Sequence, residues 1–428
     1  MARSSPLLNS FRADGALLER YGPAATGVGG QGGAGQVEVV QAFEPLDVEY
    51  AALRRASGLI DLPQRATIEV RGTDRLDFLN RMLTQELKGV QPLSATRAFW
   101  LSRQGRIDAD LRVLVLEDRV LLDVDVFALA KTLQTLAAYI ISEDVEMADR
   151  TEEFHRFALH GPAARAALDR ASTPVRGQAS TELAPGQVAV VRIAEAECIV
   201  DRADTAGEIG LEVLVAANLA AGVHAEVLRA GGFVRNPQGV IAHTSTKGAL
   251  VRPIGWGAYN VARIEAGTPF YFLDFGPTNV PHESGVLDSR VSFTKGCYLG
   301  QEIVARLHAR GQPKERLVGL RLPGPPVPGK SGTGGADFDA TADFDPPLVP
   351  QPVTGAAVFL ADSTTSAEQV GSVCSSAVSP MLGGVPVCFA MVRSKHLTPG
   401  AAFVVECEGA MLPAAMQQGL VFWTRPKG

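Results

Sequence analysis

The sequence predicts an α+β protein, in which two successive α+β domains are followed by an all-β domain. Its 428 residues are too many for one ordinary hydrophobic core, which favours two or three domains. The order strand, helix, paired strands and helix occurs twice before the proline- and glycine-rich stretch that begins at Pro323. After that stretch, short β-rich runs alternate with turns, as in a small barrel or sandwich.

Composition excludes some classes of partner. Hydrophobic residues make up 46% of the chain and charged residues 20%, the ordinary balance of a globular protein. The net charge is −6 and the pI is about 5.7. Because proteins that neutralise many phosphates usually carry a basic surplus, we expect no direct nucleic-acid partner.

Five cysteines without a CxxC pair suggest neither a disulfide framework nor a tetrahedral zinc site. We therefore predict no metal site and a reducing compartment. No apolar run reaches the roughly 18–20 residues that span a bilayer, and no apolar segment with a cleavage site follows Arg3. A cytoplasmic protein without a membrane partner is expected.

Residues 1–45 are predicted to form a flexible N-terminal extension. The glycine-rich stretch Gly27–Gly35 is superficially like a dinucleotide-binding loop. Such a loop needs a strand before the glycines, and Tyr21-Gly-Pro-Ala-Ala does not form one. Its composition favours a linker.

The first α+β domain is assigned to residues 46–152. Apolar spacing, alternation and turn residues predict its elements in order. They are a helix over Glu49–Ser57, a strand over Arg65–Arg71, a helix capped by Thr73-Asp74, strands over Asp110–Leu116 and Val120–Val126, and a helix over Phe127–Tyr139.

The second α+β domain is assigned to residues 153–312 and the all-β domain to residues 313–428. The second domain's predicted elements are strands over Phe157–His160, Val188–Ile193, Cys198–Val200 and Gly210–Val215, with helices over Pro162–Arg170 and Asn218–Ala230. In the third domain, strands are predicted over Leu317–Leu322, Ala356–Leu360, Val370–Ser375, Val385–Val392 and Ala402–Cys407. The low-complexity stretch 323–352 lies after the first of these strands, so we predict a disordered insertion within this domain.

Functional groups are concentrated in the octapeptide Lys295-Gly-Cys-Tyr-Leu-Gly-Gln-Glu302. Cys297 lies two positions from Lys295, and a nearby ammonium favours thiolate over thiol. A helix is predicted to start at Gln301, and the amides at its N-terminus could stabilise the thiolate further. The alternative is that Cys297 is a small buried hydrophobic residue, as many free cysteines are.

The octapeptide resembles the signature of the YgfZ family, within the folate-binding superfamily that includes the glycine-cleavage T-protein (aminomethyltransferase). The resemblance extends from about Glu49 to Leu397 and includes Ala262–Tyr271, Pro281–Gly285 and Gly371–Pro380. It implies two α+β (ferredoxin-like) domains, the first binding folate, and a β-barrel, arranged around a central folate channel. Tetrahydrofolate or a derivative is the implied cofactor.

The resemblance also implies site residues. In T-proteins a segment Gly-Tyr-Thr-Gly-Glu-x-Gly-x-Glu binds the pterin through its first glutamate, which corresponds here to Glu208. A carboxylate suits that role because two oxygens can accept the adjacent N–H and amino donors of a pterin. The alternative is an exposed turn glutamate. Asp110, Arg263, Tyr298 and Gln301 are further predicted cofactor contacts, and Cys297 and Lys295 are the predicted catalytic residues.

Two departures from the T-protein pattern argue against aminomethyl transfer. Ala109 replaces the first aspartate of a T-protein pair, leaving Asp110, although Asp108 would share its strand face. Ala258-Tyr259-Asn260 replaces Ala-Arg-Asp. The sequence therefore leaves enzymatic activity uncertain and favours a tetrahydrofolate-binding YgfZ-type protein that supports iron–sulfur enzymes, with iron–sulfur proteins or cluster-assembly machinery as partners.

Two other functions remain open. The first is a true aminomethyltransferase that transfers a one-carbon unit to tetrahydrofolate. The second is a folate-dependent demethylase of small methylated amines, which would normally be joined to a flavin-binding oxidase domain. The sequence contains no convincing dinucleotide-binding motif for such a domain.

Overall fold

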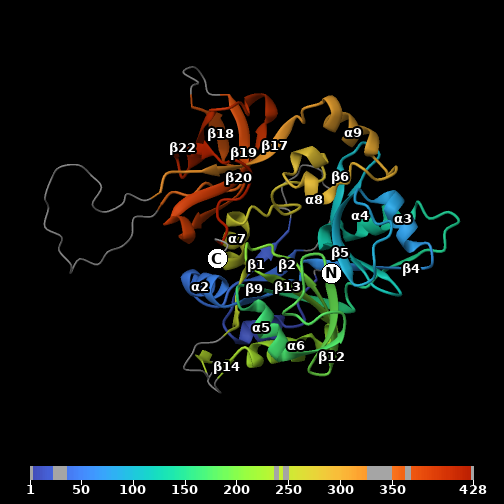
Figure 1. The fold of residues 1–428 in the computed structure, drawn as a ribbon. Coiled ribbons are helices and arrows are strands. Elements are labelled where there is room, and N and C mark those ends of the chain that lie inside the picture. Colours follow the sequence, from blue (N-terminus) through green and yellow to red (C-terminus); the bar gives the residue numbers. More distant parts are fainter. Residues whose placement is uncertain are drawn as a thin grey trace, which may run out of the picture.

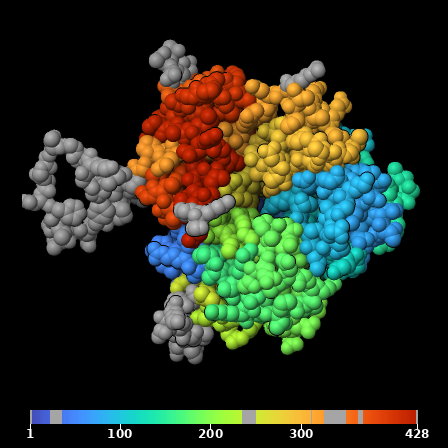
Figure 2. Space-filling view, in the orientation of Figure 1, coloured from blue at the N-terminus to red at the C-terminus, as the bar shows by residue number. Residues whose placement is uncertain are grey.

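The computed structural model describes residues 3–22, 36–235, 241–243, 250–324, 349–361 and 368–425. The expectations for Gly27–Gly35 and for most of the 323–352 insertion lie outside these residues. Figures 1 and 2 show three regions that meet around the centre of the molecule, formed by early, middle and late parts of the chain. This arrangement confirms the predicted fold class of mixed α/β domains with a C-terminal β-barrel.

The first region is built on an antiparallel five-stranded sheet of order β5-β6-β7-β4-β8. Its strands are β4 (Arg65–Arg71), β5 (Ser94–Leu101), β6 (Ile107–Val115), β7 (Val120–Asp125) and β8 (Glu146–Asp149). Helices α3 (Arg75–Met82) and α4 (Val126–Ala137) pack on one face through Phe78, Leu79 and Leu136. The predicted strand pair and the helix after it are confirmed. Asp74 is the N-cap of α3, but its carboxylate accepts from the backbone N–H of Asp144 instead of capping the helix.

The second region is a seven-stranded sheet of order β10-β11-β12-β13-β9-β3-β16. Its strands are β3 (Gly58–Asp61), β9 (Phe154–His160), β10 (Ser172–Arg176), β11 (Val188–Ile193), β12 (Ala196–Arg202), β13 (Gly210–Ala216) and β16 (Arg252–Pro253). Helices α5 (Ala164–Ala171) and α6 (Ala220–Ala230) cover one face. Strand β3 pairs with β9, so a segment from the predicted first domain completes the second sheet. The predicted domain boundaries stay predictions.

The N-terminal stretch is ordered where it is described. It forms α1 (Leu8–Ala13) and an antiparallel hairpin of β1 (Leu17–Tyr21) and β2 (Val37–Ala42). This differs from the expected flexible extension over residues 1–45. The physical reason is burial, since Phe11 and Val40 join the core of the second sheet. The short amphipathic runs on either side of the glycines carry little sequence signal of their own.

The third region is a closed barrel of order β17-β20-β19-β18-β21-β22. Its strands are β17 (Glu315–Arg321), β18 (Ala357–Leu360), β19 (Gln369–Ser379), β20 (Val385–Arg393), β21 (Ala402–Cys407) and β22 (Ala410–Met416). Strands β17 and β18 flank the predicted insertion and belong to one barrel, as expected. Helices α2 (Leu46–Arg55) and α7 (Trp256–Glu265) lie between the barrel and the second sheet, where Leu53, Ile264 and Phe389 share a core.

A connecting segment leads from α7 to the barrel along the edge of the first sheet. It contains η2 (Pro281–Glu283), α8 (Leu287–Arg290) and α9 (Gln301–Arg310), the last of which was predicted to start at Gln301. The other described elements are β14 (Phe233–Arg235), β15 (Ile241–His243), η1 (Ala217–Leu219), η3 (Pro380–Leu382) and η4 (Ser394–His396). Within the described residues, no helix has the length and apolarity needed to cross a membrane.

Candidate functional site

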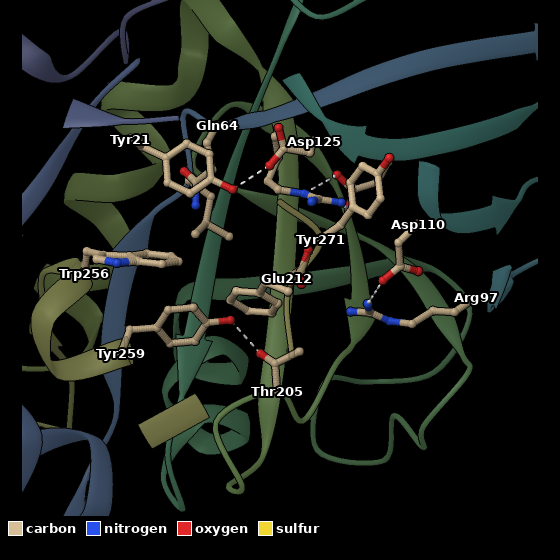
Figure 3. Close-up of a pocket in the computed structure, with 14 residues that line it drawn as sticks. Tyr21, Gln64, Arg97, Asp110, Asp125, Thr205, Glu212, Trp256, Tyr259 and Tyr271 are labelled. Carbon is tan, nitrogen blue, oxygen red and sulfur yellow. Dashed lines mark hydrogen bonds and ion pairs between the residues drawn. The ribbon is translucent and has the colours of Figure 1, made fainter. Parts of the chain in front are cut away.

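A cavity lies between the two sheets, on the faces opposite to their covering helices. Strand alternation creates it: in β6, Leu111 and Val113 face α3 and α4, whereas Asp110 and Arg112 face the second sheet. The cavity contains about 590 Å³ of empty space, part of it in its open mouth. Figure 3 shows its lining, and the charged residues on its wall are Arg65, Arg97, Asp110, Asp123, Asp125 and Glu212.

Asp110 is the carboxylate at one end of the cavity. It accepts a hydrogen bond of 2.9 Å from Nε of Arg290, which ends α8, and its other oxygen lies 4.0 Å from Arg97. Burial, and then the neighbouring Arg290, lower the pKa of Arg97 to about 10. Two guanidinium groups therefore lie against the Asp110 carboxylate beside the cavity.

Glu212 enters the cavity from β13. Leu211 and Val213 point into the core under α5 and α6, so alternation directs Glu212 toward the first sheet. It forms ion pairs with Arg112 and with Arg156, the latter at 3.0 Å. Burial raises the pKa of Glu212, but the two guanidinium groups outweigh burial and bring it well below its ordinary value. The carboxylate is therefore charged at neutral pH, and it retains lone pairs that can accept further donors.

Asp125 lies beside Tyr21, whereas Asp110 lies beyond Tyr271 and next to Arg97 (Figure 3). One carboxylate oxygen accepts the Tyr21 hydroxyl at 2.5 Å, and the other accepts the backbone N–H of Phe127 at 2.9 Å, which caps α4. Burial raises the pKa of Asp125 to about 6. The adjacent Asp123 is held instead by Arg65, whose Nε and Nη2 donate to its two oxygens.

Aromatic rings form the remaining wall. Trp256 lies 5.7 Å from Tyr21, 5.7 Å from Tyr259 and 6.1 Å from Phe270, measured between ring centroids. Tyr271 adds another ring, and its hydroxyl donates to the backbone carbonyls of β6. A cavity with flat apolar walls and a few charged groups is the usual form of a site for a planar heterocyclic ligand.

His160 supports this wall from behind. Its ring stacks on Tyr259 with centroids 5.0 Å apart, and it is fully buried, with no hydrogen-bond partner for either ring nitrogen among the described residues. Burial lowers the pKa of His160 to about 4. The imidazole is thus neutral in the folded protein.

His160 should make the fold sensitive to mild acid. Below the ordinary histidine pKa of about 6.5, the unfolded chain binds a proton that the folded chain refuses until about pH 4. Stability is therefore lost as pH falls through this window, by about 2 kcal/mol between pH 7 and pH 5. Urea denaturation of the wild type and His160→Gln at both pH values measures this loss, since all other titrations are shared. An equal loss in both proteins would contradict the prediction.

The predicted site residues separate into those near the cavity and those away from it. Asp110 lines the cavity, as expected of a ligand contact. Glu208 does not line it: it is 5% exposed and accepts two hydrogen bonds from the Arg425 guanidinium, with Arg54 at 3.6 Å. The C-terminal residues thus cover Glu208, and its predicted role in binding the pterin stays untested.

Arg263 also lies outside the cavity wall. It is fully buried and forms an ion pair with Asp274, which in turn accepts the Ser375 hydroxyl from β19. Its guanidinium lies over Phe270, 5.2 Å from the ring centroid. Arg263 therefore joins α7 to the barrel and supports an aromatic residue of the wall, and direct ligand contact stays a prediction.

The octapeptide packs against the outer edge of the first sheet. Gly300 has φ +78°, and a Cβ there would lie 2.8 Å from the Ser102 carbonyl oxygen, so the close approach requires glycine. Tyr298 is buried in the core of the first sheet, and the backbone N–H of Gln301 donates to the Tyr298 carbonyl. Cys297 is a free, exposed cysteine. None of the residues Tyr298, Gln301 and Cys297 lines the cavity.

Lys295 has a structural contact that the sequence did not predict. Its ammonium donates to the backbone carbonyls of Asn80, Leu83 and Gln85, at 2.5, 2.8 and 2.8 Å, and so caps the C-terminal end of α3. Burial lowers its pKa to about 8. The predicted catalytic role of Lys295 is untested, but its charge is directed at α3.

Replacing Lys295 by methionine should destabilise the protein by about 2–3 kcal/mol, because three carbonyls lose a charged donor. Lys131→Met is the matched control: its side chain is 56% exposed and its ammonium pairs with Asp108, so the expected loss is below about 1 kcal/mol. Urea denaturation compares the two variants. Equal losses would show that the cap contributes nothing beyond a surface ion pair.

Sequence reasoning missed most of the cavity wall. Glu212 could have been found, since it is a lone acidic residue inside the predicted apolar strand Gly210–Val215. Asp123 and Asp125 likewise alternate within a predicted strand. Tyr21 gave no such signal, because it lies in the stretch predicted to be flexible. Among the described residues, no group of three or more His, Cys, Asp or Glu side chains is placed to hold a metal ion.

Comparison with known proteins identifies the family. The GCVT N-terminal domain matches residues 21–295, and the glycine cleavage T-protein C-terminal barrel domain matches residues 343–422. This chain is 28% identical to an aminomethyltransferase of Caldanaerobacter subterraneus subsp. tengcongensis over 287 residues, which are 67% of this chain and 71% of the relative. An aminomethyltransferase of Bacillus pumilus is 25% identical over 324 residues, 75% of this chain and 80% of the relative.

A crystal structure of the glycine cleavage system aminomethyltransferase T from Bartonella henselae shares the fold. It aligns with a TM-score of 0.74 and 19% identity, over 99% of both chains. Because the N-terminal family model alone spans more than half of the chain, this protein belongs to the glycine cleavage T-protein (GCVT) family.

Proposed function

We propose that this protein binds tetrahydrofolate in the cavity between its sheets and transfers a one-carbon unit to it, as an aminomethyltransferase-like enzyme. The observation that carries the proposal is the pair of arginine-bound carboxylates, Asp110 and Glu212, that face one aromatic-lined cavity from two different sheets. The relatives named aminomethyltransferase support the same chemistry.

The residues of the wall suit a folate. Glu212 is charged, and a carboxylate can accept the adjacent N–H and amino donors of a pterin ring. The rings of Tyr259 and Phe270, 6.0 Å apart, offer faces to a planar heterocycle. We therefore assign the pterin contact to Glu212, four residues after Glu208, and the two variants Glu212→Gln and Glu208→Gln distinguish these assignments.

Asp110 is the candidate for proton transfer. Its carboxylate is fixed by Arg290 and faces Arg97, so it could hold or accept a proton at a reacting nitrogen without rotating. The first aspartate of the T-protein pair is Ala109 here, and Ala109 points into the core of the first sheet. Asp110 would therefore act alone.

The assay is the formation of methylenetetrahydrofolate from tetrahydrofolate and an aminomethyl-lipoyl carrier protein. The proposal expects product that depends on both substrates and on the enzyme. Tight folate binding without any product would remove the enzymatic part and leave a binding protein.

The octapeptide favours a second candidate function, the support of iron–sulfur enzymes in the manner of YgfZ proteins. Cys297 is exposed on a segment held rigidly by Lys295 and Gly300, so its thiol is accessible to a partner. Iron–sulfur proteins or their assembly machinery would be that partner, with tetrahydrofolate bound in the cavity.

A gene-deletion strain tests this candidate. Loss of the gene should lower the activity of iron–sulfur enzymes, and Cys297→Ala should fail to restore it, whereas Cys374→Ala, in the barrel, should restore it. Full restoration by Cys297→Ala would exclude a role for the thiol.

A further inference from the structure

The end of the cavity around Asp125 has a different chemistry from the rest. Asp110, Asp123 and Glu212 each form an ion pair with arginine. Asp125 does not: within the described part of the chain it forms no ion pair, and it accepts hydrogen bonds from a hydroxyl and a backbone N–H. It is 2% exposed. A buried carboxylate without a cation in direct contact is costly unless a ligand supplies the charge.

Gln64 faces the same region without a partner. It is 4% exposed, it lines the cavity, and its Oε1 has no hydrogen-bond partner among the described residues. Figure 3 shows Gln64 beside Tyr21, on the side of the cavity away from Arg97. A buried acceptor left open in this way calls for a donor from a ligand or water.

The surrounding rings complete an aromatic cage. Tyr21 and Trp256 meet at 71° between ring planes, and Phe127 stacks behind Tyr21 at 6.0 Å between centroids. The hydroxyl bond to Asp125 fixes Tyr21, so this wall is preformed. Aromatic faces around a site with a carboxylate and an open acceptor are the pattern that binds alkylammonium ions.

We propose that Asp125, Gln64, Tyr21 and Trp256 form a subsite for a small alkylammonium ligand, separate from the pterin contact at Glu212. The inference rests on the proposed function, because it names the chemical class of a second ligand that would bind in the cavity proposed for folate. Asp125 lies on β7 of the first sheet, whereas Glu212 lies on β13 of the second sheet. Tyr21 comes from the N-terminal hairpin, so that hairpin sets the specificity of the subsite.

The raised pKa of Asp125 agrees with this arrangement. Burial brings it to about 6, and a bound cation would lower it again toward its ordinary range. Arg65, the nearby cation, is occupied by both oxygens of Asp123.

Ligand-observed NMR titration tests the subsite with choline, methylammonium and the uncharged choline isostere 3,3-dimethyl-1-butanol. We expect at least one ammonium ion to bind saturably, and choline to bind about ten-fold more tightly than its isostere. Asp125→Asn should weaken ammonium binding by about ten-fold, as should Trp256→Leu. Equal affinities for choline and its isostere, or no saturable ammonium binding, would overturn the proposal.

Tetrahydrofolate titration of the same proteins separates this proposal from the proposed function. Folate binding without ammonium binding refutes the subsite alone, and ammonium binding without folate binding refutes the proposed function alone.

Discussion

Replacing Arg112 by methionine should lower the free energy of unfolding by about 3–5 kcal/mol, the largest stability loss that we expect. Arg112 is 3% exposed on its side chain and forms ion pairs with Asp201 and Glu212 across the interface of the two sheets. Methionine fills similar space but leaves two buried carboxylates short of a cation. Urea denaturation at pH 8 measures the loss. At this pH a buried carboxylate without its cation must either stay charged or take up a proton, and both cost free energy.

Arg192→Met is the control for Arg112→Met. Arg192 pairs with Glu197 on the β11–β12 hairpin, with side chains 54% and 50% exposed, so its loss should cost less than about 0.5 kcal/mol. If both variants lost the same stability, the charges between the sheets would not hold them together. The double variant Arg112→Met with Asp201→Asn should recover part of the loss, because it removes one orphaned charge.

Replacing Asp110 by asparagine should reduce one-carbon transfer to tetrahydrofolate by about 100-fold or more. Asparagine keeps the shape of the side chain and can still accept from Arg290, but it cannot take a proton. The expected change is in kcat, with folate affinity altered much less. Rates with the aminomethyl-lipoyl carrier protein measure it.

Asp108→Asn provides the matched control for this loss of rate. Asp108 belongs to the same strand, but its carboxylate pairs with Lys131 of α4 and does not line the cavity. We expect its rate to stay within about two-fold of the wild type. An Asp110→Asn enzyme as active as Asp108→Asn would show that Asp110 has no role in proton transfer.

Much of the fold could be predicted because its strands and helices carry strong local patterns. The strand Arg65–Arg71 and the strand Ala402–Cys407 are found at the predicted bounds. The N-terminal hairpin could not be predicted, since it is stabilised by long-range burial of residues such as Val40 of β2 in the core of the second sheet. The entry of β3 into the second sheet is likewise a long-range pairing.

The candidate site was harder to predict than the fold. Asp110 was found through its strand and its resemblance to T-proteins, but the resemblance pointed to Glu208, and the structure places Glu212 in the cavity. Glu208 precedes β13, whereas Glu212 lies inside it, where alternation directs its side chain between the sheets. Lys295 was expected near a reactive thiol, whereas its ammonium caps α3, a contact between residues more than 200 positions apart.

The most direct test of the central claim is isothermal titration of tetrahydrofolate into wild type, Glu212→Gln and Glu208→Gln, with circular dichroism to confirm that each is folded. We predict saturable binding to the wild type, a loss of affinity of about ten-fold or more in Glu212→Gln, and nearly unchanged affinity in Glu208→Gln. A folded wild type that does not bind tetrahydrofolate, or a Glu212→Gln variant that binds it as tightly as wild type, would contradict the account.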